Sequence, residues 1–432
     1  MNKHFVLNPK VRIASKTSGK HHFFGFHDLC PWDASGKYML AMETDFIDRP
    51  PRADDVAKIC LIDVGKNTLE ILTETRAWNF QEGSRVQWLP NEPEKIMYND
   101  YDNNHDKFVS VALNVKSREK RMFSYPIYAV SPDGDIALGL NFTRLQKYGG
   151  YGYAQKLPIT NYQLSNIDEP SPQNDGIFRV DFKTGEAKLI ISIHAIAHLN
   201  NSPKENEHHI LTHIAFNPSG TRICFIDKYK LPDGGFMQRL ITANPDGTDA
   251  YVLPGHVSHF DWKSDAEIFA YGKFSPKITA LRGKGIFQNQ ILKPFLNIGR
   301  KMRGILKQKI AGQSYLLLAD KTQNVKRIGV GLMTEDGHPQ FSPDGKWVIA
   351  DTYPDKNHER TLMLYDWASK KRIDIGKFKS LPEGFPETWD TSEMRSDLHP
   401  RWNRSGTAVC VDSVHEGTRQ MYVLDVQNAV LL

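Results

Sequence analysis

Five histidines recur at the same point of a repeating sequence pattern, and they are the residues best suited to chemistry. The chain has only 16 His among its 432 residues. The five that open a similar strand-forming stretch are His27, His213, His259, His338 and His399. Neutral imidazoles are ligands for Zn²⁺ or Mn²⁺, and imidazoles gathered at one point can instead bind an anion. The pattern predicts one of these two sites if the fold brings the five together.

The repeat is clearest in residues 336–350, DGHPQFSPDGKWVIA. Residues 338–341 are typical of a strand, Ser342 to Gly345 of a tight turn, and residues 346–350 of a second strand. The proline of the turn presets φ, and the glycine takes the position with positive φ. Further copies begin at His27, His213, His259 and His399, and weaker ones at Ser84 and Tyr128. Seven copies of one two-strand unit predict a repeat architecture.

Further strands and polar turns such as GKNT, KTGE and PDGT follow the copies. Four antiparallel strands repeated seven times predict an all-β fold, a seven-bladed β-propeller that takes in residues 1–432 as a single domain. The innermost strand of each blade begins at the central channel, so the histidines of the last four blades should converge there. A short strand at residues 10–14 is expected to close the ring by pairing with the last blade.

Polar and aromatic residues are expected at the same mouth of the channel. Those before the inner strand of blade two and after the inner hairpin of blade three are Asn79, Gln81, Arg85, Arg144, Tyr151 and Tyr153. Amides bond sugar hydroxyls and aromatic rings cover the apolar face of a sugar, so this composition suits a carbohydrate site. The same residue types also cap turns, pack between blades and form surface loops, and the sequence leaves both interpretations open.

One stretch breaks the composition of the chain. Residues 273–310 contain ten Lys or Arg and no Asp or Glu, with apolar residues at roughly helical spacing. We expect a basic helical insertion in blade five, at about residues 273–312. Such a helix can lie on an anionic membrane, clamp a polyanionic substrate over the channel, or pack on the propeller with a solvated basic face.

The overall composition is that of an ordinary globular protein, with 40% hydrophobic and 24% charged residues. A formal net charge of +5 is small for this length and does not indicate nucleic acid as a partner. There is no apolar run typical of a signal peptide or a membrane span, and the four Cys are scattered without CxxC spacing. We therefore expect a cytoplasmic protein with buried thiols. Motifs such as GxSxG, HExxH and the phosphate-binding P-loop are absent.

A seven-bladed propeller with histidines in its channel resembles the propeller polysaccharide lyases of the TolB-like fold, namely the oligogalacturonate lyases and ulvan lyases. The stretches that resemble a related bacterial family linked to polysaccharide loci are WNFQEGSRVQWL, NFTRL with GYGY, DGHPQFSPDGKW, DTYPD and RSDLHPRW. The resemblance implies a divalent metal, zinc or manganese, in the channel. The implied ligands are His213, His259, His338 and His399, with Gln340 as a fifth.

The resemblance also implies cleavage of an acidic oligosaccharide or polysaccharide by β-elimination. This reaction needs a group that neutralises the C5 carboxylate of a uronate, a base for the C5 proton and an acid for the leaving oxygen. We assign Arg144, helped by Asn79 and Gln81, to the carboxylate, and His27 and Tyr151 to the base and the acid. Arg85 and Tyr153 would contact the sugar. The alternative is a non-catalytic propeller that binds glycans or partner proteins and docks on a membrane through the basic insertion.

Overall fold

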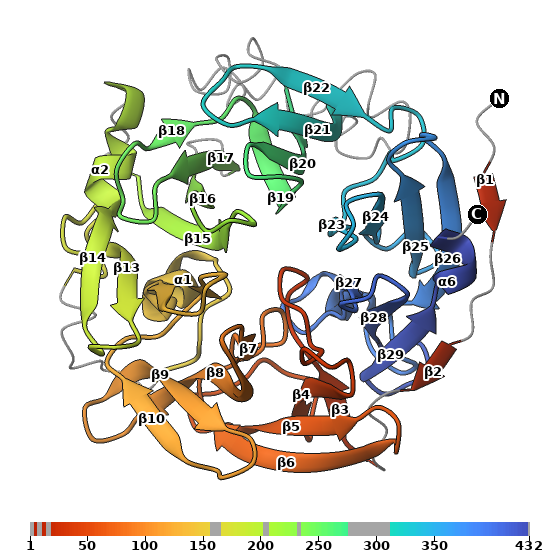
Figure 1. The fold of residues 1–432 in the computed structure, drawn as a ribbon, viewed down its shortest axis with the longest axis horizontal. Helices are drawn as coiled ribbons and strands as arrows, with labels where there is room; N and C mark the ends of the chain where they lie inside the picture. The colour runs from red at the N-terminus through yellow and green to blue at the C-terminus, as the bar shows by residue number, and fades with distance from the viewer. Residues whose placement is uncertain are drawn as a thin grey trace.

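Seven antiparallel sheets stand around a central opening, which confirms the seven-bladed propeller (Figure 1). The structure is a computed structural model that describes residues 4–6, 11–13, 19–155, 166–201, 207–230, 235–274 and 312–430. The expected basic insertion falls almost wholly outside these residues. No helix in the described ranges is long and apolar enough to cross a membrane.

The blades follow the chain in order, each running from the channel outward. Blade one contains β3 (His21–Phe23), β4 (Tyr38–Thr44), β5 (Ala57–Asp63) and β6 (Thr68–Thr75). Blade two contains β7 (Gln87–Leu89), β8 (Glu92–Asp102), β9 (Lys107–Asn114) and β10 (Lys120–Phe123). Blade three contains β11 (Ala129–Val130), β12 (Ile136–Gly139), β13 (Gly176–Asp181) and β14 (Ala187–Ser192). Blades four and five contain β15 (His209–Phe216), β16 (Ile223–Lys230), β17 (Phe236–Ala243) and β18 (Tyr251–Val252), and β19 (His256–Trp262), β20 (Glu267–Lys273), β21 (Gln313–Ala319) and β22 (Val325–Ile328). Blades six and seven contain β23 (Gln340–Phe341), β24 (Trp347–Ala350), β25 (Glu359–Asp366) and β26 (Arg372–Lys379), and β27 (Arg401–Trp402), β28 (Ala408–Ser413) and β29 (Gln420–Asp425).

The N-terminal segment closes the ring. Strand β2 (Val11–Ile13) pairs antiparallel with β29 as the fourth strand of blade seven, as expected from residues 10–14. Strand β1 (His4–Val6) adds to β26 of blade six in parallel. The first residues of the chain thus join the last two blades, which covers sheet edges that would otherwise be open.

The second strand of each blade explains the apolar runs in the repeat. Strand β24 is buried along its whole length, and β4 nearly so, because each blade is covered on both faces by its neighbours. Strand β6 lies at the rim, and half of its residues are exposed to solvent instead. The turn before β24 forms as expected: the N–H of Gly345, at φ +70°, donates to the carbonyl of Ser342 at 2.8 Å.

Among the described residues, three short α-helices lie outside the sheets: α1 (Phe142–Tyr148), α2 (Ile193–Ala197) and α6 (Gln427–Val430). Helix α1 follows the inner hairpin of blade three. The side chain of Asn141 caps its first turn by accepting the N–H of Arg144, and Gly149 ends it at φ +83°. The helix therefore sets the start of the loop that carries Tyr151.

Blade one departs from the repeat in the way that matters most for the channel. Its innermost strand is β3, so His27 does not open a strand as the pattern predicted. Residues 24–31 form a loop between β3 and β4 that runs into the centre of the ring (Figure 1), and we call this loop the plug. Gly25 in the plug has φ +135°, and a Cβ there would lie 2.7 Å from the backbone of Glu82. Only glycine fits this crossing.

A buried ion pair of blade seven holds the backbone of the plug. Arg401 and Asp412 are both fully buried and pair at 3.0 Å. The carboxylate of Asp412 accepts the N–H of Phe24 at 3.2 Å, and Arg401 donates to the carbonyls of Gly25 and, at 3.1 Å, Phe26. The pair thus satisfies backbone groups that have no strand partner.

We expect Arg401→Ala to lower the free energy of unfolding by about 3–5 kcal/mol, because it leaves the Asp412 charge buried without a partner. Arg401→Lys keeps the charge but loses the forked geometry, so its free energy of unfolding should lie between those of the wild type and Arg401→Ala. Urea unfolding measures the effect. Arg404→Ala, an exposed site on the same hairpin, serves as the control and should change stability by less than about 0.5 kcal/mol. Equal stabilities of the Arg401 and Arg404 variants would contradict the role given to this pair.

Candidate functional site

Four of the five predicted histidines come together beside the plug. The ring centroids of His259 and His338 are 4.4 Å apart, and those of His338 and His399 are 4.3 Å apart. The ring of His27 lies 5.3 Å from that of His338. The histidines come from strands or loops on neighbouring blades, so their convergence follows from the radial symmetry of the repeat.

The fifth histidine, His213, lies on the other side of Phe26. The Phe26 ring is 4.9 Å from His213 and 5.0 Å from His399 by ring centroid. His213 also faces the ring of Tyr151 at 6.1 Å. The structure therefore brings His213 to the channel but does not place it in the cluster of His259, His338 and His399.

Oxygen acceptors orient the three clustered imidazoles. The Nδ1 atom of His259 is 3.0 Å from a carboxylate oxygen of Asp336, and that of His338 is 2.9 Å from one of Asp351. The Nδ1 of His399 donates to the carbonyl of Gly25 at 2.8 Å. Because these oxygens can only accept, each Nδ1 carries a proton, and in the neutral ring each Nε2 keeps its lone pair. This outer ring of acceptors is typical of histidines that bind metal.

Asp397 adds a carboxylate to the cluster. One ligand atom from each of His338, Asp397 and His399 lies within 4.8 Å of the others. The Nε2 of His399 is buried and has no hydrogen-bond partner in the described part of the chain. Two imidazole nitrogens and a carboxylate oxygen, with His259 beside them, therefore fit a divalent cation such as Zn²⁺ or Mn²⁺.

Two arginines hold Asp397 in its ionised form. Its oxygens pair with Arg360 at 2.7 Å and with Arg395 at 2.8 Å. Burial by itself would raise the pKa of Asp397, but the two guanidinium groups outweigh it and hold this pKa below the usual range. The carboxylate is therefore charged at neutral pH and available as a ligand.

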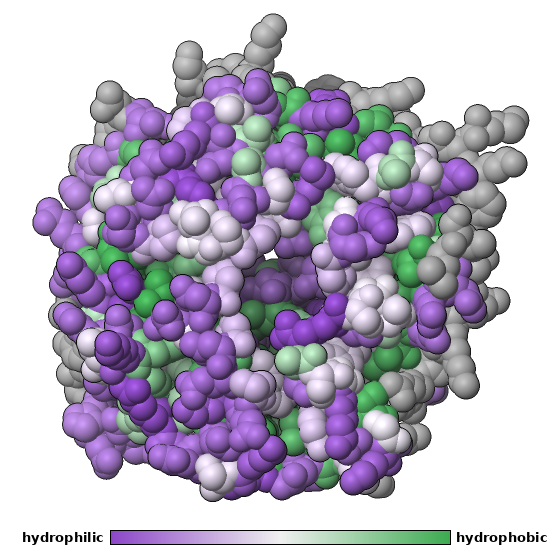
Figure 2. Space-filling model, viewed as in Figure 1, coloured by the Kyte–Doolittle hydropathy of each residue, from purple (hydrophilic) through white to green (hydrophobic). Residues whose placement is uncertain are grey.

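Arg395 also connects the cluster to the channel mouth. Its Nη2 donates to the phenol oxygen of Tyr151 at 3.0 Å. Tyr353, which is 36% exposed, lies with its ring about 6 Å from His338 and His259 (6.1 and 6.2 Å). A phenol that accepts a hydrogen bond from Arg395 keeps its own proton free for donation. In the space-filling view the centre of the ring is a hollow (Figure 2).

The imidazoles differ in their charge. Burial, with smaller contributions from nearby cationic or imidazole groups, lowers the pKa of His27, His213 and His399 well below the ordinary value. Burial acts in the same direction on His259, but Asp336 outweighs it and raises the pKa of His259. The three imidazoles with lowered pKa are therefore neutral at physiological pH and can accept a proton or bind a metal.

Three residues at the channel have a backbone in the left-handed region. His213, His399 and Arg85 have φ of +54°, +42° and +55°, values that cost a residue with a side chain of order 1–3 kcal/mol. In β15 and β19 the pairing register shifts next to His213 and His259, so the bulges turn these rings toward the axis. Strain and bulges at these positions favour a functional role.

Several predicted residues support the site from outside it. Asn79 donates to the carbonyls of Tyr151 and Gly152, at 3.2 and 3.1 Å. Gln81 donates to the carbonyls of Glu393 and Arg395, at 3.2 and 2.9 Å. These amides fix the loops that carry Tyr151 and Arg395, and their donors are used by the protein rather than offered to a sugar.

Two arginines of the prediction are likewise occupied. Arg85 binds both oxygens of Asp28 in the plug, at 3.0 and 2.6 Å, and stacks on Tyr128. Arg144 is buried in α1 and donates to backbone carbonyls of residues 167, 169, 170 and 209. Neither guanidinium is placed to neutralise a substrate carboxylate, because its N–H groups already have partners.

Two further residues of the prediction are structural. Tyr153 is fully buried, stacks on Phe142 with ring centroids 4.2 Å apart and accepts a hydrogen bond from Asn99. Gln340 donates to the carbonyl of His27 at 2.9 Å and accepts the N–H of Trp402 at 2.8 Å. The amide of Gln340 therefore holds the plug against blade seven and is not a fifth ligand.

Sequence reasoning did not assign a role to Phe26, Asp351, Arg360, Arg395 or Tyr353. Asp351 and Tyr353 lie in the stretch DTYPD, directly after the second strand of blade six, and Arg395 begins the stretch RSDLHPRW, which leads into the inner strand of blade seven. That spacing was a usable signal for Asp351 and Arg395. Phe26 gave none, because an aromatic residue before His27 is equally typical of a core strand.

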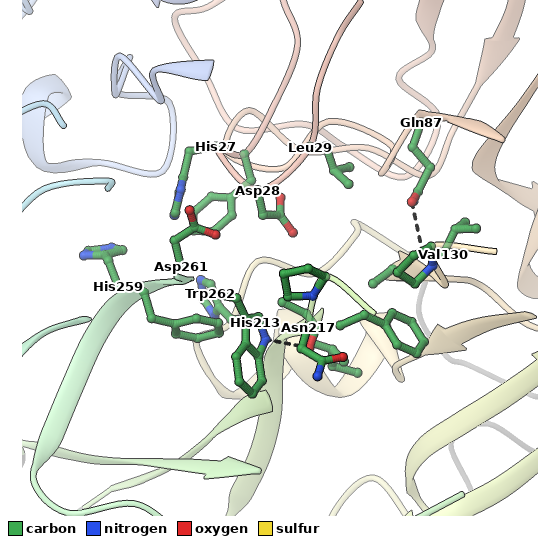
Figure 3. Close-up of a pocket in the computed structure, with 18 residues that line it drawn as sticks. His27, Asp28, Leu29, Gln87, Val130, His213, Asn217, His259, Asp261 and Trp262 are labelled. Atoms are coloured by element: carbon green, nitrogen blue, oxygen red, sulfur yellow. Dashed lines mark hydrogen bonds between the residues drawn. The ribbon is translucent and has the colours of Figure 1, made fainter. Parts of the chain in front are cut away.

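A cavity of about 270 Å³ lies beyond the plug, along the inner strands of blades four and five. His27 and Asp28 border it on one side, and His213, His259 and Asp261 on the other (Figure 3). It reaches Pro132 and Pro218, which are exposed at the turns between the first two strands of blades three and four. The channel thus has a loop-side mouth with the histidine cluster and a hairpin-side cavity.

The solved structures with a similar fold include two oligogalacturonate lyases. One, from Vibrio parahaemolyticus, is 14% identical over 99% of both chains, with a TM-score of 0.59. The other, an oligogalacturonate lyase in complex with manganese, is 14% identical over 100% of both chains, with a TM-score of 0.60. No protein-family model matches the sequence, and no curated protein matches it. The chain therefore has the oligogalacturonate lyase fold over its whole length.

We expect His27 to make the protein less stable in mild acid. Its pKa is lowered on folding, so below about pH 6.5 the unfolded state binds the extra proton, and stability falls as the pH falls. The contribution is at most about 1.4 kcal/mol per pH unit for one proton. Urea unfolding of His27→Gln and of the parent, between pH 8 and pH 5 with a chelator present, measures it.

The comparison with the parent is needed because some buried groups titrate in the opposite direction. Burial raises the pKa of Glu82 to about 7, and the pKa of His259 is also raised. Both bind protons more readily in the folded state, so they add stability as the pH falls. Below pH 6.5 we expect the free energy of unfolding of His27→Gln to rise relative to that of the parent. His105→Gln, which changes a side chain that is 70% exposed, should show no such rise. Parallel pH profiles for parent and His27→Gln would refute the assignment.

Proposed function

We propose that this protein is a lyase that cleaves uronate-containing oligosaccharides by β-elimination, with a divalent cation bound in the channel. The observation that carries the proposal is the set of three imidazoles whose Nδ1 atoms are held by oxygen acceptors beside an ionised carboxylate. The fold shared with an oligogalacturonate lyase that was solved in complex with manganese supports it.

His259, His338, His399 and Asp397 would hold the cation. When bound, it would supply positive charge that neutralises the carboxylate of a uronate and so makes the C5 proton more acidic. Arg395 lies beside this position with its own charge partly balanced by Asp397. The site is therefore suited to an acidic sugar.

The remaining two roles fall to residues at the mouth. We assign His213 as the base, because its lowered pKa keeps the ring neutral at physiological pH and the ring faces Tyr151. Tyr151 faces His213 and is the acid, because Arg395 occupies its oxygen and leaves the phenol proton free for the leaving oxygen. His27, which is only 2% exposed, lies behind the cluster and supports it.

A second candidate function is a propeller that binds an acidic glycan without cleaving it. The burial of His338 and His399, which are only 2% and 1% exposed, favours this second function. Docking on a membrane through residues 273–310 and a cytoplasmic location remain proposals that belong with either function.

Metal content tests the site directly. After incubation with Mn²⁺ or Zn²⁺ and removal of excess ion, we expect one equivalent by elemental analysis in the wild type. The double variant His338→Ala/His399→Ala should lose it, because both imidazole ligands are gone. His105→Ala, an exposed histidine, is the matched control and should retain the ion. Absence of metal from the wild type would leave the cluster as an anion site or a structural element.

Activity tests the proposed reaction. With the metal-loaded protein and a panel of uronate oligomers, we expect ultraviolet absorption from an unsaturated uronate product, and none from methyl-esterified or neutral oligomers. Tyr151→Phe should lower kcat by roughly 10²–10⁴-fold, because general acid catalysis contributes about this much. Tyr148→Phe, on the same loop region, should leave kcat unchanged. Binding of an acidic oligomer without cleavage would select the glycan-binding function.

A further inference from the structure

The hairpin-side cavity is a separate compartment of the channel. The plug, with Phe26 and His27, stands between it and His338 and His399, which do not line it, whereas the third histidine of the cluster, His259, does. Figure 3 shows the cavity between the plug residues and the strands of blades four and five. The cavity borders the proposed lyase site, because His213 and His259 line it as well, but the proposed reaction gives no role to its other residues.

Two carboxylates face this cavity, and only one of them has a counter-charge. Asp28 is bonded through both oxygens to Arg85. Asp261 accepts the backbone N–H of Phe341 at 2.7 Å and that of Trp262, and it forms no ion pair with any residue the structure describes. Burial raises the pKa of Asp261 to about 7, so this carboxyl is partly protonated near neutral pH, and a cation bound beside it would restore its full charge.

The walls around Asp261 are largely apolar and aromatic. They include Phe216, which is half-buried, and Trp262, together with Ile214 and Leu29. Aromatic faces attract cations, and an aromatic-lined cavity with one carboxylate is the arrangement that receives an organic ammonium group. A volume of about 270 Å³ is large enough for a small organic ion.

A bare metal ion fits these surroundings less well. A divalent cation requires several oxygen or nitrogen ligands at close range. In the described ranges the group of potential ligands that are close enough together is His338, Asp397 and His399, outside this cavity. The polar side chains Gln87 and Asn217 at its edge already bond backbone and side-chain groups of the protein.

We propose that the hairpin-side cavity binds a small organic ammonium ion, with Asp261 as its counterion and Phe216 and Trp262 against its apolar groups. The ligand enters between the first hairpin turns at Pro132 and Pro218, on the face opposite the histidine cluster. The proposal rests on Asp261 and the aromatic walls and not on the lyase reaction, although His213 and His259 border both sites.

Titration calorimetry with choline and ethanolamine tests the proposal on the full chain. The control ligand is the neutral tert-butyl analogue of choline, in which carbon replaces nitrogen. We expect at least one of the two ammonium probes to bind. If choline binds, its affinity should be at least roughly tenfold higher than that of its neutral analogue. Failure of both ammonium probes to bind, or equal affinity for choline and the analogue, would overturn the proposal.

Asp261→Asn separates the charge from the fold. The asparagine oxygen can still accept the N–H of Phe341, so the link between blades five and six is kept while the counterion is lost. We expect the ammonium affinity to fall by about tenfold or more. Asp344→Asn, which removes one charge from an exposed turn of blade six, is the matched control and should bind as the wild type does.

Phe216→Leu provides a second variant if Asp261→Asn proves unstable. Leucine keeps an apolar wall but removes the aromatic face, so the ammonium affinity should fall by roughly threefold to tenfold. The thermal unfolding temperature of each variant, compared with that of the wild type, establishes that it is folded. Unchanged ammonium affinity in folded Asp261→Asn or folded Phe216→Leu would refute the assigned contacts.

Discussion

The buried pair of Arg401 and Asp412 is the interaction on which the channel depends. A propeller leaves an opening on its axis, and this chain places in it a loop in which Phe24, Gly25 and Phe26 do not belong to a strand. Buried backbone groups must be hydrogen-bonded, and the carboxylate and guanidinium of this pair supply partners for Phe24, Gly25 and Phe26. The cost of burying two charges is thereby offset by bonds that the sheets cannot provide.

The plug in turn organises the histidine cluster. The carbonyl of Gly25 sets the proton on Nδ1 of His399, and the carbonyl of His27 holds Gln340. Phe26 separates His213 from the cluster, so two neutral imidazoles with different surroundings stand on either side of one aromatic ring. A single loop therefore fixes the tautomer of one ligand and the division of roles among the others.

The charges of the channel are arranged in two different ways. On the loop side, Asp397 lies between Arg360 and Arg395, so its charge is balanced and its position is rigid. On the hairpin side, Asp28 is balanced by Arg85, whereas Asp261 has no ion-pair partner among the described residues. The two compartments share the walls of one channel but differ in how their carboxylates are balanced.

The sequence by itself was sufficient for the repeat, the seven blades, the closing strand at Val11–Ile13 and the meeting of the channel histidines, because hydrophobic alternation and turn residues are local signals that repeat. The sequence did not reveal the plug, because this loop has the residue pattern that predicts a strand in the other copies of the repeat. Only the tertiary structure decided that the N–H groups of Arg144 are spent on backbone carbonyls while Arg395 reaches the site. That outcome depends on the register and bulges of distant strands, which no local pattern encodes.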